Sequence, residues 1–287
     1  MTKVSVLIPT YNTKEKWLKE SLQSILDQTF QDFEIIVLDD GSDHSPEAAV
    51  LSFHDDRIKF YKNETNLGVG KTRNKLLDLA TGEYIAFQDA DDISDPSRLE
   101  KQVQFLDTNP DFSGVSAGMV STLSGTEKTN PPSPLILDFL GGCTFSQNCA
   151  LLRSKDFKDC SLRYDASLRT SEDYDLWARA VVKGLKFANL QEILLKYRQV
   201  ATSLVHTQGR VGTIVDRQIK EFLLDHLTNQ PILRREVAKV VSRNDRKKCS
   251  WKERIFSVRN EWDGLQKYKI LQIFGLKIKL KKKTVKE

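Results

Sequence analysis

Short apolar runs alternate with amphipathic segments over the first hundred residues. In the amphipathic segments apolar side chains recur every three or four positions, which predicts helices such as the one that carries Leu18, Leu22 and Ile25. The runs between them are apolar throughout, which indicates strands of a parallel sheet with helices on both faces. The predicted strands are Val4–Ile8, Glu34–Leu38, Ile58–Tyr61 and Tyr84–Phe87, and two later helices are predicted over Gly70–Ala80 and Leu99–Leu106.

The pattern is looser from Asn109 to His206. Beyond His206 we expect helices followed by a short basic strand. Near the N-terminus, Asn12 with Glu15 three residues later resembles a helix start. The elements predicted in the looser part are strands at Cys149–Arg153 and Glu192–Arg198 and a helix at Glu172–Gly184.

Length and composition fit a folded α/β protein. A chain of 287 residues suits one large domain with an extension or two small domains, and 39% hydrophobic residues suffice for a core. There is no run of 18 apolar residues, so we predict no membrane-spanning helix, and the N-terminus enters the first strand without the apolar segment of a signal peptide. The four cysteines lack metal-site spacing, so we expect free buried thiols in a reducing cytoplasm.

Charge is divided unevenly along the chain. From Leu233 to Glu287 there are 18 Lys and Arg residues against 6 Asp and Glu, a balance of +12, whereas the rest of the chain has a balance of −7. The segment Lys267–Lys286 carries eight lysines, several of which alternate with apolar side chains. Two interpretations fit this segment: an edge strand whose lysines discourage aggregation, or a peripheral contact with an anionic membrane surface. The acidic body argues against a nucleic-acid partner.

Polar residues follow three of the predicted strands at the point where each strand ends. Thr10–Asn12 follows the first strand, Asp39–Ser42 the second and Asp89–Asp92 the fourth. Ligands of open α/β sheets bind beyond the carboxyl ends of the strands, so these segments predict one binding edge. The fourth strand stops directly at three carboxylates, which indicates a bound positive charge because clustered carboxylates repel one another.

The carboxylates after the fourth strand have two interpretations. Asp89 and Asp91 together favour a hard divalent cation, Mn²⁺ or Mg²⁺, because such ions prefer oxygen ligands and retain substrate phosphates. The alternative is a solvated helix N-terminus that nearby acids stabilise, and it is the better interpretation of Asp92 or Asp95 taken alone.

Two turn-like segments also have a functional and a structural interpretation. The glycine-rich segment Leu67–Asn74 has neither the P-loop nor the dinucleotide-binding spacing. It is either a plain turn or a helix start that brings Lys71 and Arg73 to a diphosphate. Asp39 either belongs to an ordinary Asp-Gly turn or accepts hydrogen bonds from a nucleotide base and ribose.

The acidic start of the helix at Glu172–Gly184 is the last candidate. Ser171 stands at the expected cap position, and Glu172 and Asp173 occupy the first turn. Acids in a first helical turn are favoured by the helix dipole alone, so the pair becomes a functional candidate only through its place in the whole set of motifs.

In this order and spacing the segments resemble the family-2 glycosyltransferases, which have the nucleotide-diphospho-sugar transferase (GT-A) fold. The resemblance extends over roughly residues 3–206. It implies a Rossmann-like, mostly parallel α/β sheet flanked by helices, to which we add a C-terminal helical and basic extension. We expect a nucleotide-sugar-binding half at 1–108, an acceptor-side half with the catalytic base at 109–206, and the extension at 207–287. The motifs are VSVLIPTYN, the segment Ser24–Asp43, NLGVGKTRN, TGEYIAFQDADD and EDYDLWAR.

The resemblance implies a donor-binding role for four residues. Tyr11 and Asp39 would hold the nucleotide base, and Thr10 would line the same pocket. Arg73 would lie near the nucleotide. Gln88 stands where the family more often has Leu, which we interpret as a harmless departure.

The resemblance also assigns the metal ligands and the catalytic base. Asp89 and Asp91 match the metal-binding DxD motif, with Asp91 as the direct ligand of the cation and Asp89 nearer the ribose and the sugar. Asp173 would be the general base, and Glu172 beside it would contact substrate. His206 is interpreted as a surface histidine in preference to a further metal or phosphate contact.

The implied reaction is an inverting transfer of a hexosyl-type sugar from a nucleotide-diphospho-sugar, expected to be a UDP-sugar, to a glycan hydroxyl. Enzymes that this chain resembles extend lipid-linked glycans for capsule or lipopolysaccharide, so we expect a lipid-linked acceptor and a cytoplasmic, peripheral position at the inner face of the plasma membrane. No acceptor signature is recognised at Cys143–Gln147.

Two other function classes remain open at this point. A nucleotidyltransferase would share an α/β nucleotide fold, but it should show a glycine- and Arg/Lys-rich loop directly after the first strand. A non-catalytic membrane-surface adaptor would not need Asp89, Asp91 and Asp173 together.

Overall fold

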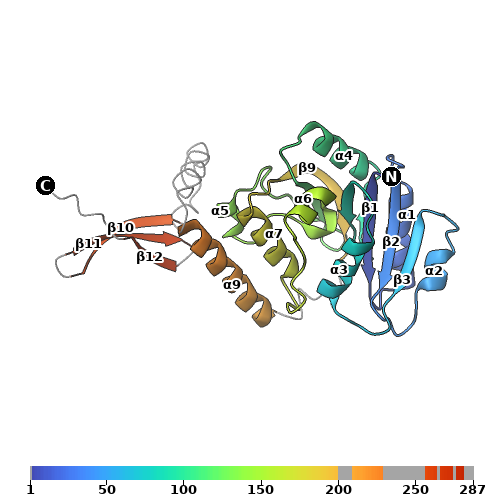
Figure 1. Ribbon diagram of the computed structural model, residues 1–287, viewed down its shortest axis with the longest axis horizontal. Helices are drawn as coiled ribbons and strands as arrows, with labels where there is room; N and C mark the ends of the chain where they lie inside the picture. The colour runs from blue at the N-terminus through green and yellow to red at the C-terminus, as the bar shows by residue number, and fades with distance from the viewer. Residues whose placement is uncertain (1, 200–208, 229–255, 264–265, 274–275, 281–287) are drawn as a thin grey trace. The chain divides into compact units, whose positions relative to one another are not determined.

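The computed structural model describes residues 2–199, 209–228, 256–263, 266–273 and 276–280 (Figure 1). Contacts divide the chain into two compact units, Met1–His226 and Leu227–Glu287. The first unit contains the predicted α/β fold, with a strongly twisted sheet between helices. Among the described residues no helix is long and apolar enough to cross a membrane.

The sheet of the first unit runs in the order β3-β2-β1-β4-β8-β6-β9-β5, and β7 adds to β6. The strands β1 to β4 are parallel, as their apolar composition predicts, whereas β8 pairs antiparallel with both β4 and β6. β6 and β9 are parallel. The strands are β1 Val4–Thr10, β2 Phe33–Asp39, β3 Ile58–Lys62, β4 Tyr84–Phe87, β5 Ile93–Ser94, β6 Gly114–Ser121, β7 Glu127–Lys128, β8 Leu151–Arg153 and β9 Phe187–Tyr197.

Helices lie on both sides of the sheet (Figure 1). The helices that follow β1, β3 and β5 are those that hydrophobic periodicity predicts, and the predicted helix at Glu172–Gly184 is present as α7, two residues shorter. The helices of the first unit are α1 Glu15–Leu26, α2 Glu47–Leu51, α3 Val69–Leu79, α4 Arg98–Thr108, α5 Ile136–Phe139, α6 Ser154–Asp159, α7 Glu172–Val182 and α9 Gly209–Thr228, with a 3₁₀ turn η1 at Gln147–Cys149.

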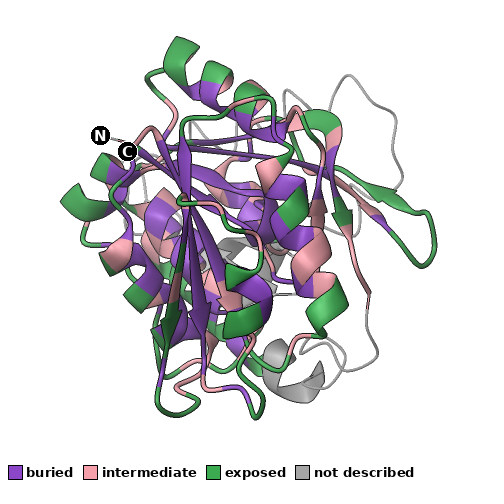
Figure 2. Ribbon diagram, turned by 90° about the vertical axis from the view of Figure 1, so that its right-hand side faces the viewer, coloured by how far each residue is buried: buried purple, intermediate pink, exposed green. Residues whose placement is uncertain are grey.

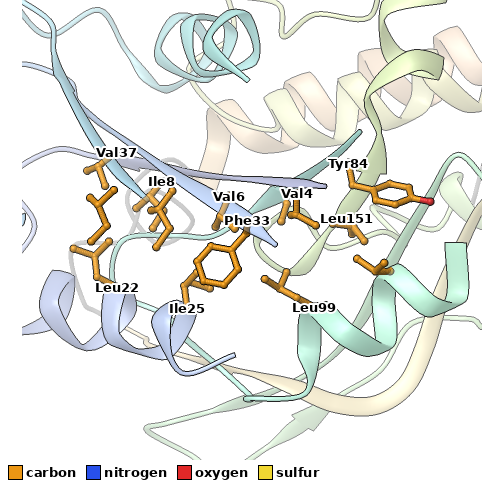
Figure 3. Packing of buried hydrophobic residues seen from close by; sticks show 14 of the residues in the cluster. Val4, Val6, Ile8, Leu22, Ile25, Phe33, Val37, Tyr84, Leu99 and Leu151 are labelled. Atoms are coloured by element: carbon orange, nitrogen blue, oxygen red, sulfur yellow. The ribbon is translucent and has the colours of Figure 1, made fainter. Parts of the chain in front are cut away.

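The main core lies between the sheet and helices α1 and α4 (Figure 3). Each fully buried aliphatic side chain in it contributes about 1.5–3 kcal/mol relative to exposure. The strands β2 and β4 are buried along their whole length, and exposed residues gather on the outer faces of the helices (Figure 2). Core residues from the strands and helices include Val4, Val6, Ile8, Leu22, Ile25, Phe33, Val37, Tyr84, Leu99 and Leu151.

The helix start predicted at Asn12 is wrong. α1 begins at Glu15, and Asn12 lies before it with φ of 49°. The Asn12 side chain instead exchanges two hydrogen bonds of 3.0 Å with Asp43, in the loop after β2. The local pattern failed here because a contact with a neighbouring strand end competes for the same amide.

The second half of the first unit contains more strand than the sequence indicates. β6 is not predicted at all, and β9 begins five residues before the predicted strand at Glu192. The residues of β6 are small, with glycines at 114 and 118, so they lack the bulky apolar run that marks a strand. Of the cysteines in the described part, all three are free, but only Cys149 is fully buried, so the expected burial holds for that thiol alone.

The C-terminal part contains a helix, α9, and a basic strand, as we expect, together with two strands that the sequence does not predict. After α9, the described residues form a three-stranded antiparallel sheet in the order β10-β11-β12. The strands are β10 Phe256–Asp263, β11 Gln266–Ile273 and β12 Leu276–Leu280. The basic strand is therefore present, paired with β11, because alternation of apolar and lysine residues has the period of a strand.

Candidate active site

The ends of β1 and β2 form one part of the predicted binding edge. Thr10 is opposite Asp39 in the register of the two strands, and both are buried. Asp39 Oδ1 accepts hydrogen bonds from the amide of Ser42 at 3.0 Å and from its hydroxyl at 2.5 Å. Asp39 Oδ2 is buried and has no hydrogen-bond partner in the described part of the chain. Such an oxygen suits a ligand that donates a hydrogen bond, while the adjacent Tyr11 ring is 48% exposed.

The next residue, Asp40, explains the glycine-rich segment. Its carboxylate accepts from the amide of Leu67 at 2.9 Å, from the amide of Gly68 at 2.9 Å and from Asn63 at 2.8 Å. These amides at the start of α3 are thus already paired within the chain, which favours the plain-turn interpretation over a diphosphate cradle. Arg73 of this segment lies elsewhere, as described next.

Arg73 connects α3 to α7 and to the end of β4. Its guanidinium donates to Glu172 Oε1 at 2.5 Å and lies 3.6 Å from Asp89 Oδ1. Arg73 is 8% exposed. Burial alone would lower its pKa, but the surrounding Tyr164 and the carboxylates raise it, so the group remains a permanent cation. Residues almost a hundred positions apart therefore share one ion-pair network.

One cleft of about 720 Å³ brings four of the predicted residues together: its wall includes Arg73, Asp89, Glu172 and Asp173. Thr10, Tyr11, Asp39 and Asp91 are not part of that wall. Parallel pairing of β1 with β2 and β4 nonetheless places them at the same edge of the sheet. The remaining wall comes from β6, from the loop before β8 and from the strand end after β9.

Three carboxylates at this edge of the sheet have raised pKa values. Burial, and then repulsion by Glu172, raises the pKa of Asp173 to about 6. Burial, and then repulsion by Asp89, raises the pKa of Asp91 to about 6. Burial raises the pKa of Asp89 as well, although Arg73 opposes the shift. A carboxylate with a pKa near 6 is a better proton acceptor than an ordinary aspartate and is still ionised at neutral pH.

The turn before α7 is fixed by a contact with α9. Ser171 occupies the predicted cap position, but its side chain does not cap the helix, and its backbone has φ of 56°. The Ser171 hydroxyl instead donates to Asp216 Oδ1 of α9 at 2.7 Å. This contact holds the residue that directly precedes Glu172 and Asp173.

Asp89 and Asp91 are suited to bind a divalent cation whose remaining ligands come from the substrate. The described residues contain no group of three or more His, Cys, Asp or Glu side chains placed to hold a metal by themselves. Two partly exposed carboxylates that repel each other do supply the oxygen ligands that Mn²⁺ or Mg²⁺ prefers, and such ions commonly take further oxygens from substrate phosphates. His206 lies outside the described residues.

The neighbouring acids Asp92 and Asp95 have structural roles. Asp92 is fully buried, so the expected solvated position is wrong for it; its oxygens accept from Asn148 Nδ2 at 2.7 Å and from the Arg198 amide at 2.9 Å. Asp95 accepts from the amide and hydroxyl of Ser97 at the start of α4.

Sequence reasoning missed the buried network beneath these acids. Gln88 is fully buried, and its Oε1 accepts from Arg98 Nη1 at 2.8 Å and from Ser94 at 2.8 Å. Its Nε2 donates to Ser21 and to the Asp92 carbonyl. Arg98 is fully buried too, and it also donates to the Phe87 carbonyl at 2.7 Å. Gln88 is therefore not an indifferent replacement for Leu, because it ties the carboxylate turn to α4.

Comparison with known proteins identifies the family. The family model described as "Glycosyl transferase family 2" matches residues 5–159, more than half of the chain. The chain belongs to glycosyltransferase family 2. The resemblance read from the motifs is thus confirmed, and the family match favours a glycosyltransferase over a nucleotidyltransferase.

Two relatives and one solved structure illustrate the similarity. The chain is 39% identical over 205 residues to the uncharacterized glycosyltransferase MJ1057 of Methanocaldococcus jannaschii. This alignment covers 68% of the present chain and 70% of MJ1057. It is 30% identical over 228 residues to the Escherichia coli UDP-Glc:alpha-D-GlcNAc-diphosphoundecaprenol beta-1,3-glucosyltransferase WfaP. This alignment covers 78% of the present chain and 84% of WfaP. Residues 1–349 of Staphylococcus aureus TarS, crystallised with UDP-GlcNAc, superpose with a TM-score of 0.67 at 23% identity over 80% of this chain and 67% of that one. That likeness confirms the GT-A fold.

Proposed function

We propose that this glycosyltransferase moves a sugar from a UDP-sugar to a glycan hydroxyl with inversion at the anomeric carbon. The observation that carries the proposal is the single cleft in which Asp173 and Asp89 lie with Glu172 and Arg73. An acid suited to accept a proton therefore shares one substrate-sized cavity with Asp89, one of the two carboxylates suited to bind a cation. The UDP-GlcNAc of the TarS complex and the UDP-Glc of the WfaP name support a uridine donor.

The donor would lie along the carboxyl edge of the sheet. Asp39, with its unpaired buried Oδ2, would accept a hydrogen bond from the base, and the exposed Tyr11 ring would stack on it. Thr10 would line that pocket. Asp89 and Asp91 would hold Mn²⁺ or Mg²⁺, which supplies Lewis-acid stabilisation of the leaving diphosphate when bound.

The acceptor would be activated by Asp173. The carboxylate takes the proton of the attacking hydroxyl as the new C–O bond forms at C1 and the bond to the nucleoside diphosphate breaks. Glu172 contacts substrate at the cleft wall and is itself held by Arg73. One displacement of this kind converts an α-linked donor into a β-linked product.

A donor screen with base-deficient variants tests the proposal. Purified protein is incubated with UDP-, GDP- and dTDP-sugars and Mn²⁺, and released nucleotide is measured before and after addition of EDTA. We expect Asp173→Asn to lower turnover by about 10²–10⁴-fold while UDP affinity stays near that of the wild type. Asp175→Asn is the matched control, since Asp175 lies on the same helix and pairs with Arg179.

Three outcomes would contradict the proposal. Equal release of nucleotide with and without EDTA would show that the reaction does not need a divalent cation. Loss of UDP binding in Asp173→Asn would place this residue in the donor pocket instead. An α-linked product from an α-linked donor would exclude the inverting displacement.

We further propose that the acceptor is lipid-linked and that the basic segment 267–286 holds the enzyme at an anionic membrane surface. Support comes from the diphosphoundecaprenol acceptor in the WfaP name and from the lysines of β12, which alternate with apolar residues in an extended strand. Each Lys near such a surface contributes about 1 kcal/mol. Residues 274–275 and 281–287 of this part lie outside the described residues.

Charge reversal in β12 tests the membrane proposal without removing a strand. Lys277→Glu with Lys279→Glu should abolish salt-sensitive sedimentation with phosphatidylglycerol liposomes. Release of nucleotide from a soluble donor should not change. Equal sedimentation of variant and wild type at low salt would favour the edge-strand interpretation.

A further inference from the structure

Gln147 is a buried amide at the wall of the candidate active site. It lies in η1, directly before β8, and the Phe87 amide at the end of β4 donates to the Ala150 carbonyl at 2.9 Å. The next residue, Asn148, donates to Asp92 at 2.7 Å. Gln147 therefore stands across from the carboxylate turn, at the same edge of the sheet.

Both polar atoms of its side chain are buried without a hydrogen-bond partner, whereas Asp39 at the same edge leaves only one oxygen unpaired. Gln147 is 5% exposed, and neither its amide nitrogen nor its amide oxygen reaches a hydrogen-bond partner within the described residues. The Tyr164 hydroxyl is buried beside this amide. Its contact with Gln147 opposes the burial that raises the pKa of Tyr164, but no hydrogen bond of ordinary geometry forms between the two side chains. Most buried polar groups in folded proteins are paired, so neighbouring unpaired groups at a substrate cleft call for a ligand that pairs them.

The chemistry of the amide selects the kind of ligand. An amide offers a donor and an acceptor, and a hydroxyl can use both. A diphosphate offers acceptors only, and the base pocket at Asp39 is not part of this cleft wall. A glutamine has three rotatable bonds. Because this amide forms no hydrogen bond of ordinary geometry within the described residues, it can turn into the cleft at little cost.

We propose that Gln147, with Tyr164 behind it, binds a hydroxyl of the transferred sugar and determines which sugar the enzyme accepts. Its position opposite the Asp89–Asp92 turn favours the donor sugar over the acceptor sugar. The inference rests on the proposed function, because it presupposes a nucleotide-sugar in this cleft.

The test combines Gln147→Met with deoxy analogues of the donor. Methionine keeps the length of the side chain and removes its hydrogen-bonding atoms. For the UDP-sugar that wild type hydrolyses best, kcat/KM of Gln147→Met should fall by about 10–100-fold, the effect of losing one hydrogen bond to a bound hydroxyl. With the 2-, 3-, 4- and 6-deoxy donors, one analogue should be hydrolysed equally by variant and wild type, because it lacks the hydroxyl that Gln147 binds. Free UDP should bind both proteins equally.

Stability separates this role from a structural one. Since the Gln147 amide makes no hydrogen bond of ordinary geometry within the described residues, Gln147→Met should melt at or above the wild-type temperature. Asn148→Leu is the matched control: its amide has an internal partner in Asp92, so this variant should melt at a lower temperature. A lower melting temperature for Gln147→Met would overturn the argument from unpaired atoms.

Two kinetic results would also overturn the inference. Equal fold losses with all four deoxy donors would show that Gln147 binds none of those hydroxyls. Unchanged donor hydrolysis with impaired transfer would place the residue at the acceptor. If wild type released no nucleotide from any sugar donor, the proposed function itself would fail, which is a different result.

Discussion

Glu34 offers a stability test that is separate from the active site. It lies in the first half of β2, five residues before the strand end that carries Asp39. Its carboxylate accepts from Ser5 at 2.6 Å, from Lys59 at 2.7 Å, and from the amide and hydroxyl of Thr81 at 3.1 and 2.7 Å. Burial would raise the pKa of Glu34, but these hydrogen bonds lower it from 4.5 to about 2.

The magnitude follows from that shift. A folded pKa below the unfolded one means that the ionised group stabilises the fold above pH 4.5 and that this stabilisation disappears as the pH falls toward 2. A shift of this size corresponds to at most about 3 kcal/mol at pH 7. Lys59 is half exposed and therefore screened, and a glutamine keeps some of the hydrogen bonds, so we expect Glu34→Gln to destabilise by about 1–3 kcal/mol.

Urea unfolding at several pH values measures the effect. The difference in unfolding free energy between wild type and Glu34→Gln should be full at pH 7 and should shrink between pH 4.5 and 2. Turnover per folded molecule should not change, because the site lies at the opposite strand ends. Glu64→Gln, a change at an exposed loop position, is the control and should be nearly neutral. A difference that is constant with pH, or that grows on acidification, would refute the assignment of the low pKa.

Three further predictions concern the site. Gln88→Leu should destabilise the fold by about 1–3 kcal/mol in thermal melts, because it removes a hydrogen-bond acceptor of the fully buried Arg98. It should also lower turnover, and a variant as stable as wild type would show that this hydrogen-bond network does not stabilise the fold. The acid limb of kcat/KM should lie near pH 6, where Asp173 loses its proton as pH rises, and a profile that stays flat down to pH 5 would exclude that base. Gly41→Ala should lower the affinity for UDP, measured by calorimetry, because Gly41 has φ of 73° and an added Cβ would lie 2.6 Å from the Thr65 backbone. Unchanged affinity would show that this turn does not shape the base pocket.

The sequence by itself determined the parallel half of the sheet. Short, largely apolar runs at β1, β2 and β4, separated by helical segments, predict strands that are covered on both faces, and polar residues at their carboxyl ends then share an edge. The pattern failed for β6, where glycines and serines replace the bulky side chains that mark a strand. It also failed at Asn12, where a partner in another loop competes with the local helix signal.

Only the tertiary structure decided how the candidate residues work together. The pairing of Arg73 with Glu172 joins residues 99 positions apart, and no local pattern encodes such a contact. The same holds for Gln88, whose structural role depends on a hydrogen bond from the buried Arg98, ten residues away. It also holds for Gln147, whose unpaired amide becomes apparent only when its surroundings are known. Residue type and spacing determine which groups can react. Burial and neighbouring charges determine their pKa values and which of their donors and acceptors stay unpaired, and both arise only when distant segments pack against one another.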